Sequence, residues 1–247
     1  MSSLNANIIN EVQKLFAKKK TWVFLAITGI VCFLSAFFIT SIQVKLIFIS
    51  MSSMSFPLMV LSIFTNVFLP LFIFMAASEL FAGEIADKTL KLVLTMPISR
   101  LKVYISKIIA IAIYIFINLL VLFIVSTISS LCLNLGTINI YTVLISYLID
   151  MLPAIILGIF AAFIVQFFKS SSSALVSSIL IFVGIRVVAL FNSGLNNNIF
   201  TSYLDWYSLW FRSGSNFLRT GNILLMILSY GIIFFTVGYY LFDKREV

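Results

Sequence analysis

Six apolar stretches, each long enough to cross a lipid bilayer, dominate this chain of 247 residues. Hydrophobic residues make up 62% of the sequence, whereas charged residues make up only 10%. A water-soluble domain of this length could not bury so much apolar surface, because its exterior has to face water. The sequence therefore predicts an all-α membrane protein of one domain, 1–247, with six transmembrane helices.

The boundaries of the spans follow from the thickness of the membrane. A helix needs about 20 apolar residues to cross a hydrocarbon core of roughly 30 Å. On this criterion the predicted spans are 22–42, 56–77, 108–133, 143–168, 174–191 and 223–242. The segments left over are an N-terminal stretch, 1–20, and two long connections, 79–107 and 192–222.

Basic residues indicate which side of the membrane each connection faces. Threading the spans from a cytoplasmic N-terminus places twelve Lys and Arg inside and three outside, namely Lys45, Arg212 and Arg219. Because basic residues collect in cytoplasmic loops, both termini are predicted to be cytoplasmic in a plasma membrane of the bacterial type. The same rule accounts for the net charge of +8, so no nucleic-acid partner is expected.

The N-terminal stretch carries a helical pattern. Its apolar residues recur at spacings of three and four, at Leu4, Ile8, Val12, Leu15 and Phe16. This pattern predicts an amphipathic helix in the membrane interface, with the lysines of 18–20 near anionic head groups. The alternative is a solvated N-terminus without fixed structure.

The connection 79–107 is the longest predicted cytoplasmic segment, and it is dense in charges of both signs. Its first half is too apolar for a solvated linker, whereas Pro97 breaks the pattern and Ser99 is placed to cap a helix starting at Arg100. Glu79 and Glu84 lie five residues apart and so would not share a face of an α-helix. They could line a cytoplasmic entrance, contact a partner, or end a solvated helix. The mixed composition favours a partner.

The outer connection 192–222 is rich in Asn, Ser and aromatic residues. Its aromatic core is too short and polar to span the bilayer, and such side chains favour the membrane–water interface. Short extracellular helices, interfacial or re-entrant, are therefore predicted between the fifth and sixth spans.

Catalytic chemistry is hard to build from this composition. The chain has no His, so a Ser–His or Cys–His pair is impossible, and no Gly-Lys dipeptide is present to form a phosphate-binding loop. Cys32 and Cys132 lie in apolar runs without metal-ligand spacing. We therefore expect no catalytic, metal or cofactor site in this chain, and any ATP and Mg²⁺ would bind to another polypeptide.

Two ionisable residues fall inside predicted spans. Asp150 and Arg186 each lie roughly 10 Å below the outer surface, at 1.5 Å per helical residue. Equal depth on adjacent antiparallel helices predicts an intramembrane ion pair, either structural or part of a substrate or proton site.

The motif between the second and third spans resembles the type-2 ATP-binding-cassette (ABC) transporter permeases. It comprises Glu84, Thr89-Leu90, Pro97-Ile98-Ser99-Arg100 and Lys107, while Lys88 replaces the glycine typical of that family. The order of interfacial helix, six spans, cytoplasmic segment and outer helices is similar as well.

This resemblance implies the membrane-spanning subunit of an ATP-driven exporter. Such a subunit pairs with a second, identical or homologous permease in the bilayer, and each docks a separate ABC ATPase through a coupling helix, here around 85–95. The residues so assigned to ATPase contact are Glu84, Asp87, Lys88, Thr89, Leu90, Lys91, Val93, Leu94, Pro97, Ser99 and Arg100. A second, smaller cytoplasmic contact would comprise Lys169, Ser170 and Ser171.

Two other functional classes compete with this interpretation. An intramembrane hydrolase or lipid-modifying enzyme would need polar catalytic groups clustered at one depth, and an ion-coupled carrier would need matched broken helices; an assembly factor is a further alternative. The 26 Phe residues and the lack of an evident charged cavity favour an amphipathic or hydrophobic cargo such as a peptide, antibiotic or lipid.

Overall fold

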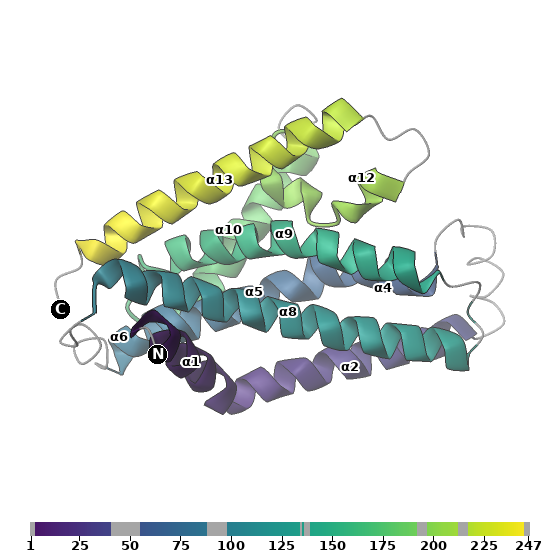
Figure 1. Ribbon diagram of the computed structural model, residues 1–247, viewed down its shortest axis with the longest axis horizontal. Coiled ribbons are helices and arrows are strands. Elements are labelled where there is room, and N and C mark those ends of the chain that lie inside the picture. Colours follow the sequence, from purple (N-terminus) through teal and green to yellow (C-terminus); the bar gives the residue numbers. More distant parts are fainter. Residues whose placement is uncertain are drawn as a thin grey trace.

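The computed structural model describes residues 3–40, 55–87, 98–133, 135, 139–191, 197–211 and 217–244. Across these ranges the chain is helical without a strand, and six helices are long and apolar enough to cross a membrane. The prediction of an all-α chain with six spans is confirmed for this part of the protein. The start of α1 and the end of α13 lie at the same end of the molecule (Figure 1).

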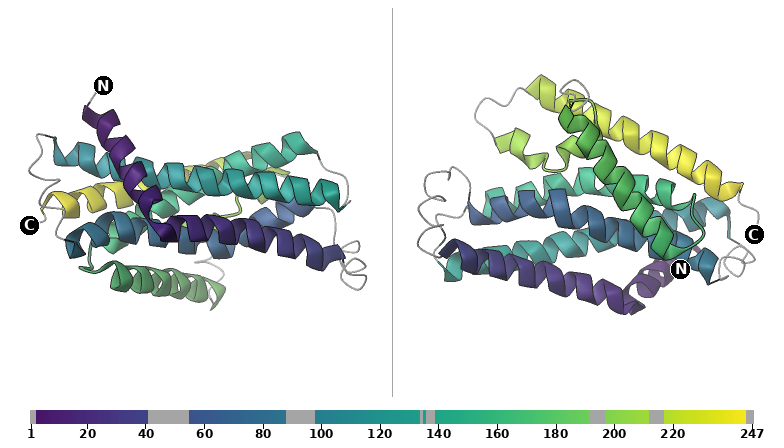
Figure 2. Two further views of the ribbon diagram at one scale, coloured as in Figure 1. Left: turned by 90° about the horizontal axis from the view of Figure 1, so that it is seen from below. Right: turned by 180° about the vertical axis from the view of Figure 1, so that it is seen from behind.

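The first two helices meet at a sharp bend. Helix α1, Ser3–Ala17, packs against α8 and crosses it at a steep angle (Figure 2). Helix α2, Lys19–Thr40, then runs along α8 as the first span. At the bend the Thr21 hydroxyl donates to the Leu15 carbonyl.

The second span is interrupted by two π-helical turns. It comprises α4 (Phe56–Ile63), the π-turn η1 (Phe64–Phe68), α5 (Leu69–Ser78), the π-turn η2 (Glu79–Gly83) and α6 (Glu84–Ala86). In a π-turn the backbone bonds run from residue i to i+5 instead of i+4, which changes the direction of the following side chains. The helix continues nine residues past the predicted end of the span at position 77.

The remaining spans are single helices. They are α8 (Arg100–Cys132), α9 (Ile140–Val165), α10 (Ser171–Phe191) and α13 (Phe217–Asp243), with the short helices η3 (Phe200–Tyr203) and α12 (Tyr207–Phe211) before the last. Helix α8 starts at the predicted Arg100, two turns before the predicted span. Ser99 stands at the N-cap in an extended conformation, but its side chain makes no capping hydrogen bond, contrary to the prediction.

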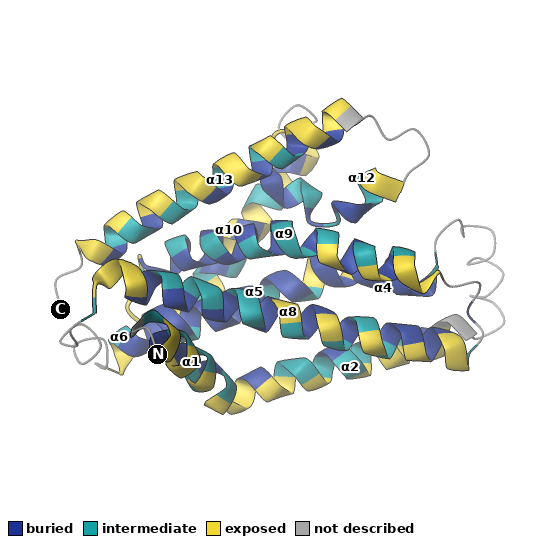
Figure 3. Ribbon diagram, viewed as in Figure 1, coloured by how far each residue is buried: buried dark blue, intermediate teal, exposed yellow. Residues whose placement is uncertain are grey.

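The core of the bundle is α5, which is buried on every side. Residues 72 to 77 are all at most 1% exposed, and α5 packs against α8, α9 and α10. The outer helices α2, α10 and α13 expose large apolar side chains, such as Phe38 and Phe191 (Figure 3). Exposed apolar surface of this extent is stable in lipid or against another protein.

The aromatic segment before α13 packs largely into the protein. Phe200, Trp206 and Tyr207 are buried, whereas Trp210 and Phe211 are partly exposed. The short helices were anticipated, but the first three rings pack in the protein core instead of lying at a membrane–water interface. For the exposed pair, a position at the interface stays a prediction.

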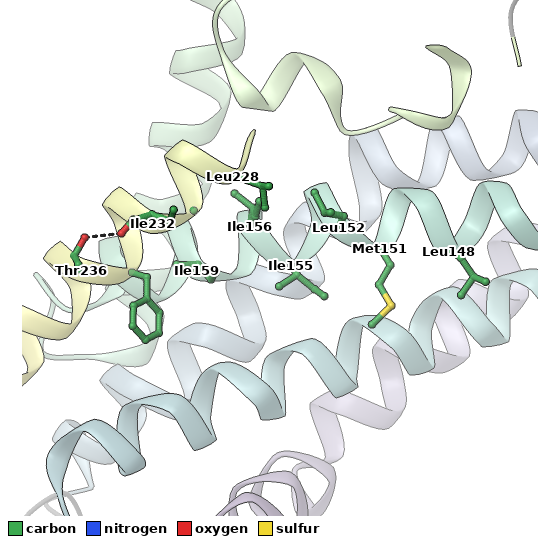
Figure 4. Close-up of a pocket in the computed structure, with 11 residues that line it drawn as sticks. Leu148, Met151, Leu152, Ile155, Ile156, Ile159, Leu228, Ile232 and Thr236 are labelled. Atoms are coloured by element: carbon green, nitrogen blue, oxygen red, sulfur yellow. Dashed lines mark hydrogen bonds between the residues drawn. The ribbon is translucent and has the colours of Figure 1, made fainter. Parts of the chain in front are cut away.

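An apolar groove of about 540 Å³ lies between α9 and α13 (Figure 4). Its lining includes Leu152, Ile155, Ile232 and Phe235. The one hydroxyl in it, on Thr236, donates to the carbonyl of Ile232 within its own helix. The groove therefore offers apolar surface and no free polar group to orient a ligand.

The close approach of α9 to its neighbours depends on Gly158. A Cβ atom at this position would lie 3.0 Å from Ile111 and 3.5 Å from Ile115, both on α8. We predict that Gly158→Leu destabilises the protein by about 1–3 kcal/mol through overpacking. Gly184→Leu is the matched control, because no atom beyond its chain neighbours and its own helix backbone lies within 4 Å of its Cβ position. Equal thermal unfolding midpoints for the two variants in detergent would contradict this packing.

Candidate functional site

Lys107 is a fully buried lysine whose ammonium group lies close to two carboxylates and one backbone carbonyl. Its Nζ lies 2.7 Å from Glu11 Oε2 and 2.8 Å from Glu84 Oε1, and it donates to the Leu80 carbonyl at 2.9 Å. An ammonium group has three donors; two of them are hydrogen-bonded here, to Glu11 and to the Leu80 carbonyl, and Glu84 supplies a second ion pair. A buried charge is stable only when paired and hydrogen-bonded, and this lysine meets both conditions.

Lys14 joins the same two carboxylates from the other side. Its Nζ lies 2.7 Å from Glu11 Oε1 and 3.0 Å from Glu84 Oε1. We call Glu11, Lys14, Glu84 and Lys107 the charge network. Through it, α1, α6 and α8 share two lysines and two glutamates that alternate in space.

The charge network keeps Glu11 and Lys14, its two residues on α1, in their charged states. Burial alone raises the pKa of Glu11, but the neighbouring Lys107 and Lys14 outweigh it, so the pKa falls below its ordinary 4.5. Burial alone lowers the pKa of Lys14, but bonding to Glu11 and Glu84 raises it above its ordinary 10.5. Both groups are therefore ionised at neutral pH.

Glu79 forms a second junction one turn before the network. Its carboxylate lies 2.7 Å from Lys20 Nζ and 3.3 Å from Lys18 Nζ, and it accepts a hydrogen bond from the Ser171 hydroxyl at 3.1 Å. Lys18 and Lys20 lie around the α1–α2 bend, and Ser171 begins α10. Glu79 thus ties the start of the fifth span to the start of the first.

The π-turn η2 lets Glu79 and Glu84 face the same neighbour. The sequence prediction that they do not share a face assumed an α-helix, and it is wrong. Because η2 bonds residue i to i+5, residues five apart lie on nearly the same side of the helix. Both carboxylates consequently meet lysines of the N-terminal region, Lys14 at Glu84 and Lys18 and Lys20 at Glu79.

Comparison with known proteins identifies the family of this chain. Residues 7–192 match the family described as ABC-2 family transporter protein. The chain belongs to this family. A relative from Bacillus subtilis (strain 168), described as the uncharacterized membrane protein YdbK, is 27% identical over 197 residues, which cover 74% of this chain and 79% of the relative. An ABC-2 protein of this kind is a membrane component of a transporter and not its catalytic subunit.

The face by which α1 packs in this ABC-2 protein is partly polar. Its buried stripe is Asn7, Glu11 and Leu15, whereas Ile9 is 43% exposed. The Asn7 amide donates to the Ser106 hydroxyl at 2.7 Å. The sequence predicted burial of the apolar stripe in lipid, but α1 presents paired polar groups to α8 as well. Its location in the membrane interface stays a prediction.

The other residues assigned to ATPase contact divide into two groups. Seven of them lie outside the described residues, namely Lys88, Thr89, Leu90, Lys91, Val93, Leu94 and Pro97. Asp87 is exposed at the end of α6, and the Arg100 guanidinium donates to the Asp243 carbonyl at the end of α13. Of the residues predicted to form a second cytoplasmic contact, Lys169 is exposed and the Ser170 hydroxyl accepts from the Ser173 amide, capping α10.

Asp150 and Arg186 do not form the predicted ion pair. Asp150 is fully buried and accepts a hydrogen bond at 2.8 Å from the backbone amide of Tyr207. The Arg186 guanidinium donates to Asn66 Oδ1 at 2.6 Å. The sequence predicts similar depth for the two residues, but α9 directs Asp150 toward the 200–211 segment and α10 directs Arg186 toward η1. Depth along a helix does not determine the direction around its axis.

Glu11 is the site residue that sequence reasoning missed. It is the one acid among the first twenty residues, which otherwise carry four lysines. A lone carboxylate on a basic helix, in a chain with only eight acids, was a signal that it has a defined partner. Identifying Lys107 as that partner needed the fold, because 96 positions separate the two residues.

We predict that Lys107→Met destabilises the protein by about 3–5 kcal/mol, because it strands buried carboxylates. Lys102→Met, at an exposed position on the same helix, should leave the unfolding midpoint nearly unchanged. Adding Glu11→Gln to Lys107→Met should recover part of the loss, because it removes one stranded charge. Thermal unfolding followed by tryptophan fluorescence measures all three. If the Lys107 and Lys102 variants unfolded at the same temperature, the network would not stabilise the fold.

Proposed function

We propose that this chain is the permease subunit of an ATP-driven ABC exporter. In this proposal it pairs with a second permease, identical or homologous, and couples to a separate ATPase subunit that binds ATP and Mg²⁺. Family membership supports a transporter component. One observation carries the coupling role. Glu84 precedes the segment 88–97 in the sequence and Lys107 follows it, and the two side chains form an ion pair.

The charge network provides a way for a displacement of 88–97 by the ATPase to move the membrane-spanning helices. The segment connects α6 to α8, and both helices hold charges that are bound to Glu11 and Lys14 of α1. Separating any one helix from the others would leave a buried charge without its partner. The three helices would therefore move as one body when the ATPase displaces the segment.

Glu79 extends the same argument to the second proposed contact. The hydrogen bond from Ser171 ties the start of α10 to the base of the second span. Lys169 and Ser170, next to it, are exposed and thus accessible to a partner. A single ATPase surface touching both segments would then act on the first, second, third and fifth spans together.

In the proposed orientation the network lies on the cytoplasmic side of the plasma membrane. The lysines at the α1–α2 bend support this orientation, because basic residues near the membrane favour the cytoplasmic leaflet with its anionic lipids. Both termini would be cytoplasmic, since α1 and the end of α13 share that end of the molecule. The cargo we propose is amphipathic or hydrophobic, in keeping with the apolar lining of the groove between α9 and α13.

The coupling proposal is tested with Leu90→Asp, by measuring how much ABC ATPase copurifies with the tagged chain from its own cells. A charge in place of an apolar contact should lower copurification of the ATPase by roughly tenfold or more, equivalent to about 1.4 kcal/mol. Leu101→Asp, at an exposed position on α8 beyond the segment, is the matched control and should retain the ATPase. Normal copurification and cargo-stimulated ATP hydrolysis with Leu90→Asp would rule out the coupling role.

The orientation is tested with the native cysteines. Cys132 is exposed at the far end of α8 from Arg100, and Cys32 is buried. A membrane-impermeant maleimide added to intact cells should label the protein at Cys132, and Cys132→Ser should abolish the label. Labelling that appears only after the membrane is opened would reverse the proposed orientation.

A further inference from the structure

Arg186 carries a charge within a span without an ion-pair partner among the described residues. Within the described part of the chain, its guanidinium donates a hydrogen bond to the neutral amide oxygen of Asn66, at 2.6 Å. Its Nε is buried and has no hydrogen-bond partner. A guanidinium has five N–H donors, and a charge inside a membrane span is retained where it binds something.

The surroundings of Arg186 fix its position without neutralising it. The Asn66 amide nitrogen donates to the Ser62 carbonyl at 2.8 Å, which turns the Asn66 oxygen toward the guanidinium. The ring of Phe182, one turn before Arg186, lies 5.6 Å from the guanidinium carbon. The carboxylate of Asp205 acts on Arg186 through its charge but is not within ion-pair distance, and it accepts a hydrogen bond from the Ser62 hydroxyl at 3.2 Å.

Exposed apolar side chains flank this cation on both helices. Val183 and Leu190, on the turns before and after Arg186, are 48% and 83% exposed. Ile63 and Val67, on either side of Asn66, are 49% and 52% exposed. The surface therefore combines one positive charge with two apolar flanks, which is the complement of an anionic amphiphile.

The depth of Arg186 suits a lipid head group. It lies five residues before the end of α10 at Phe191, or about 7–8 Å along the axis at 1.5 Å per residue. A long arginine side chain can direct its charge over such a distance to the membrane surface. Guanidinium groups bind phosphate oxygens through paired hydrogen bonds, and lipids supply that group at this depth.

We propose that Arg186, held by Asn66, binds the phosphate of an anionic phospholipid whose acyl chains lie along Val183, Leu190, Ile63 and Val67. A cation without an ion pair among the described residues favours a negatively charged lipid over a zwitterionic one, since the latter brings its own positive charge. The binding needs neither ATP nor an ATPase, so it stands or fails independently of the coupling proposal.

The test uses the purified protein in phosphatidylcholine vesicles with a tryptophan reporter at Val183→Trp. Phosphatidylglycerol with brominated acyl chains is the probe, and brominated phosphatidylcholine at the same mole fraction is the reference. The parent protein, with its own three Trp residues, provides the signal to subtract. We expect the anionic lipid to quench the reporter several-fold more strongly than the reference lipid. Ile232→Trp, on the exposed face of α13, is the matched reporter and should show no such excess.

Substitution of the arginine decides the assignment. Arg186→Gln should abolish the excess quenching at position 183, whereas Arg186→Lys should retain much of it, because the charge remains. Equal quenching by both lipids, or an excess that persists in Arg186→Gln, would overturn the proposal. If Arg186→Gln does not fold, the comparison of positions 183 and 232 in otherwise native protein, together with Arg186→Lys, decides the outcome.

A final arm separates a lipid site from a site for a free anion. Inorganic phosphate at millimolar concentration should leave the excess quenching unchanged, because it lacks the acyl chains that contact the apolar flanks. Loss of the excess on adding inorganic phosphate would show that the ligand is a free anion, and the lipid proposal would be wrong.

Discussion

The buried ammonium of Lys107 is the constraint on which one end of this molecule depends. It requires Glu11 and Glu84 within hydrogen-bond distance, and these residues lie on two different helices. Lys14 contacts the second oxygen of Glu11 and the same Glu84 oxygen as Lys107, so α1 cannot lie elsewhere without exposing or stranding a charge. A helix that composition alone would place freely on the membrane surface is thereby attached to the second and third spans.

The two π-turns give the second span its polar functions. Each adds a residue to one turn of a helix that is otherwise apolar and central to the bundle. At η1 the turn contains Asn66, which orients Arg186; at η2 it begins with Glu79 and brings that residue onto the side of Glu84. Such turns are common at functional positions because they redirect side chains without breaking the helix. Here they supply both polar centres from one span.

The six spans could be predicted from the sequence because crossing a bilayer imposes a length and a composition on each helix by itself. The charge network could not, because Glu11 and Lys107 meet only through the crossing of α1 over α8. Glu84 was identified through its motif and assigned to a partner's surface, whereas its Oε1 lies between two lysines of its own chain. Depth placed Asp150 and Arg186 at one level, but the rotation of each helix, which packing decides, gave them different partners.

The charge network and Arg186 differ in whether basic side chains are paired with acidic ones. This difference follows from the small number of acidic residues in the chain. The chain has sixteen basic residues and eight acidic ones, and three of the acids are used at the network and at Glu79. Where carboxylates meet buried lysines, the charges satisfy each other and hold helices together as one body. Among the described residues, Arg186 donates to an amide oxygen and forms no ion pair, so we infer that its positive charge binds something outside the chain. Paired charges therefore suit the transmission of movement, and an unpaired one suits the binding of a ligand.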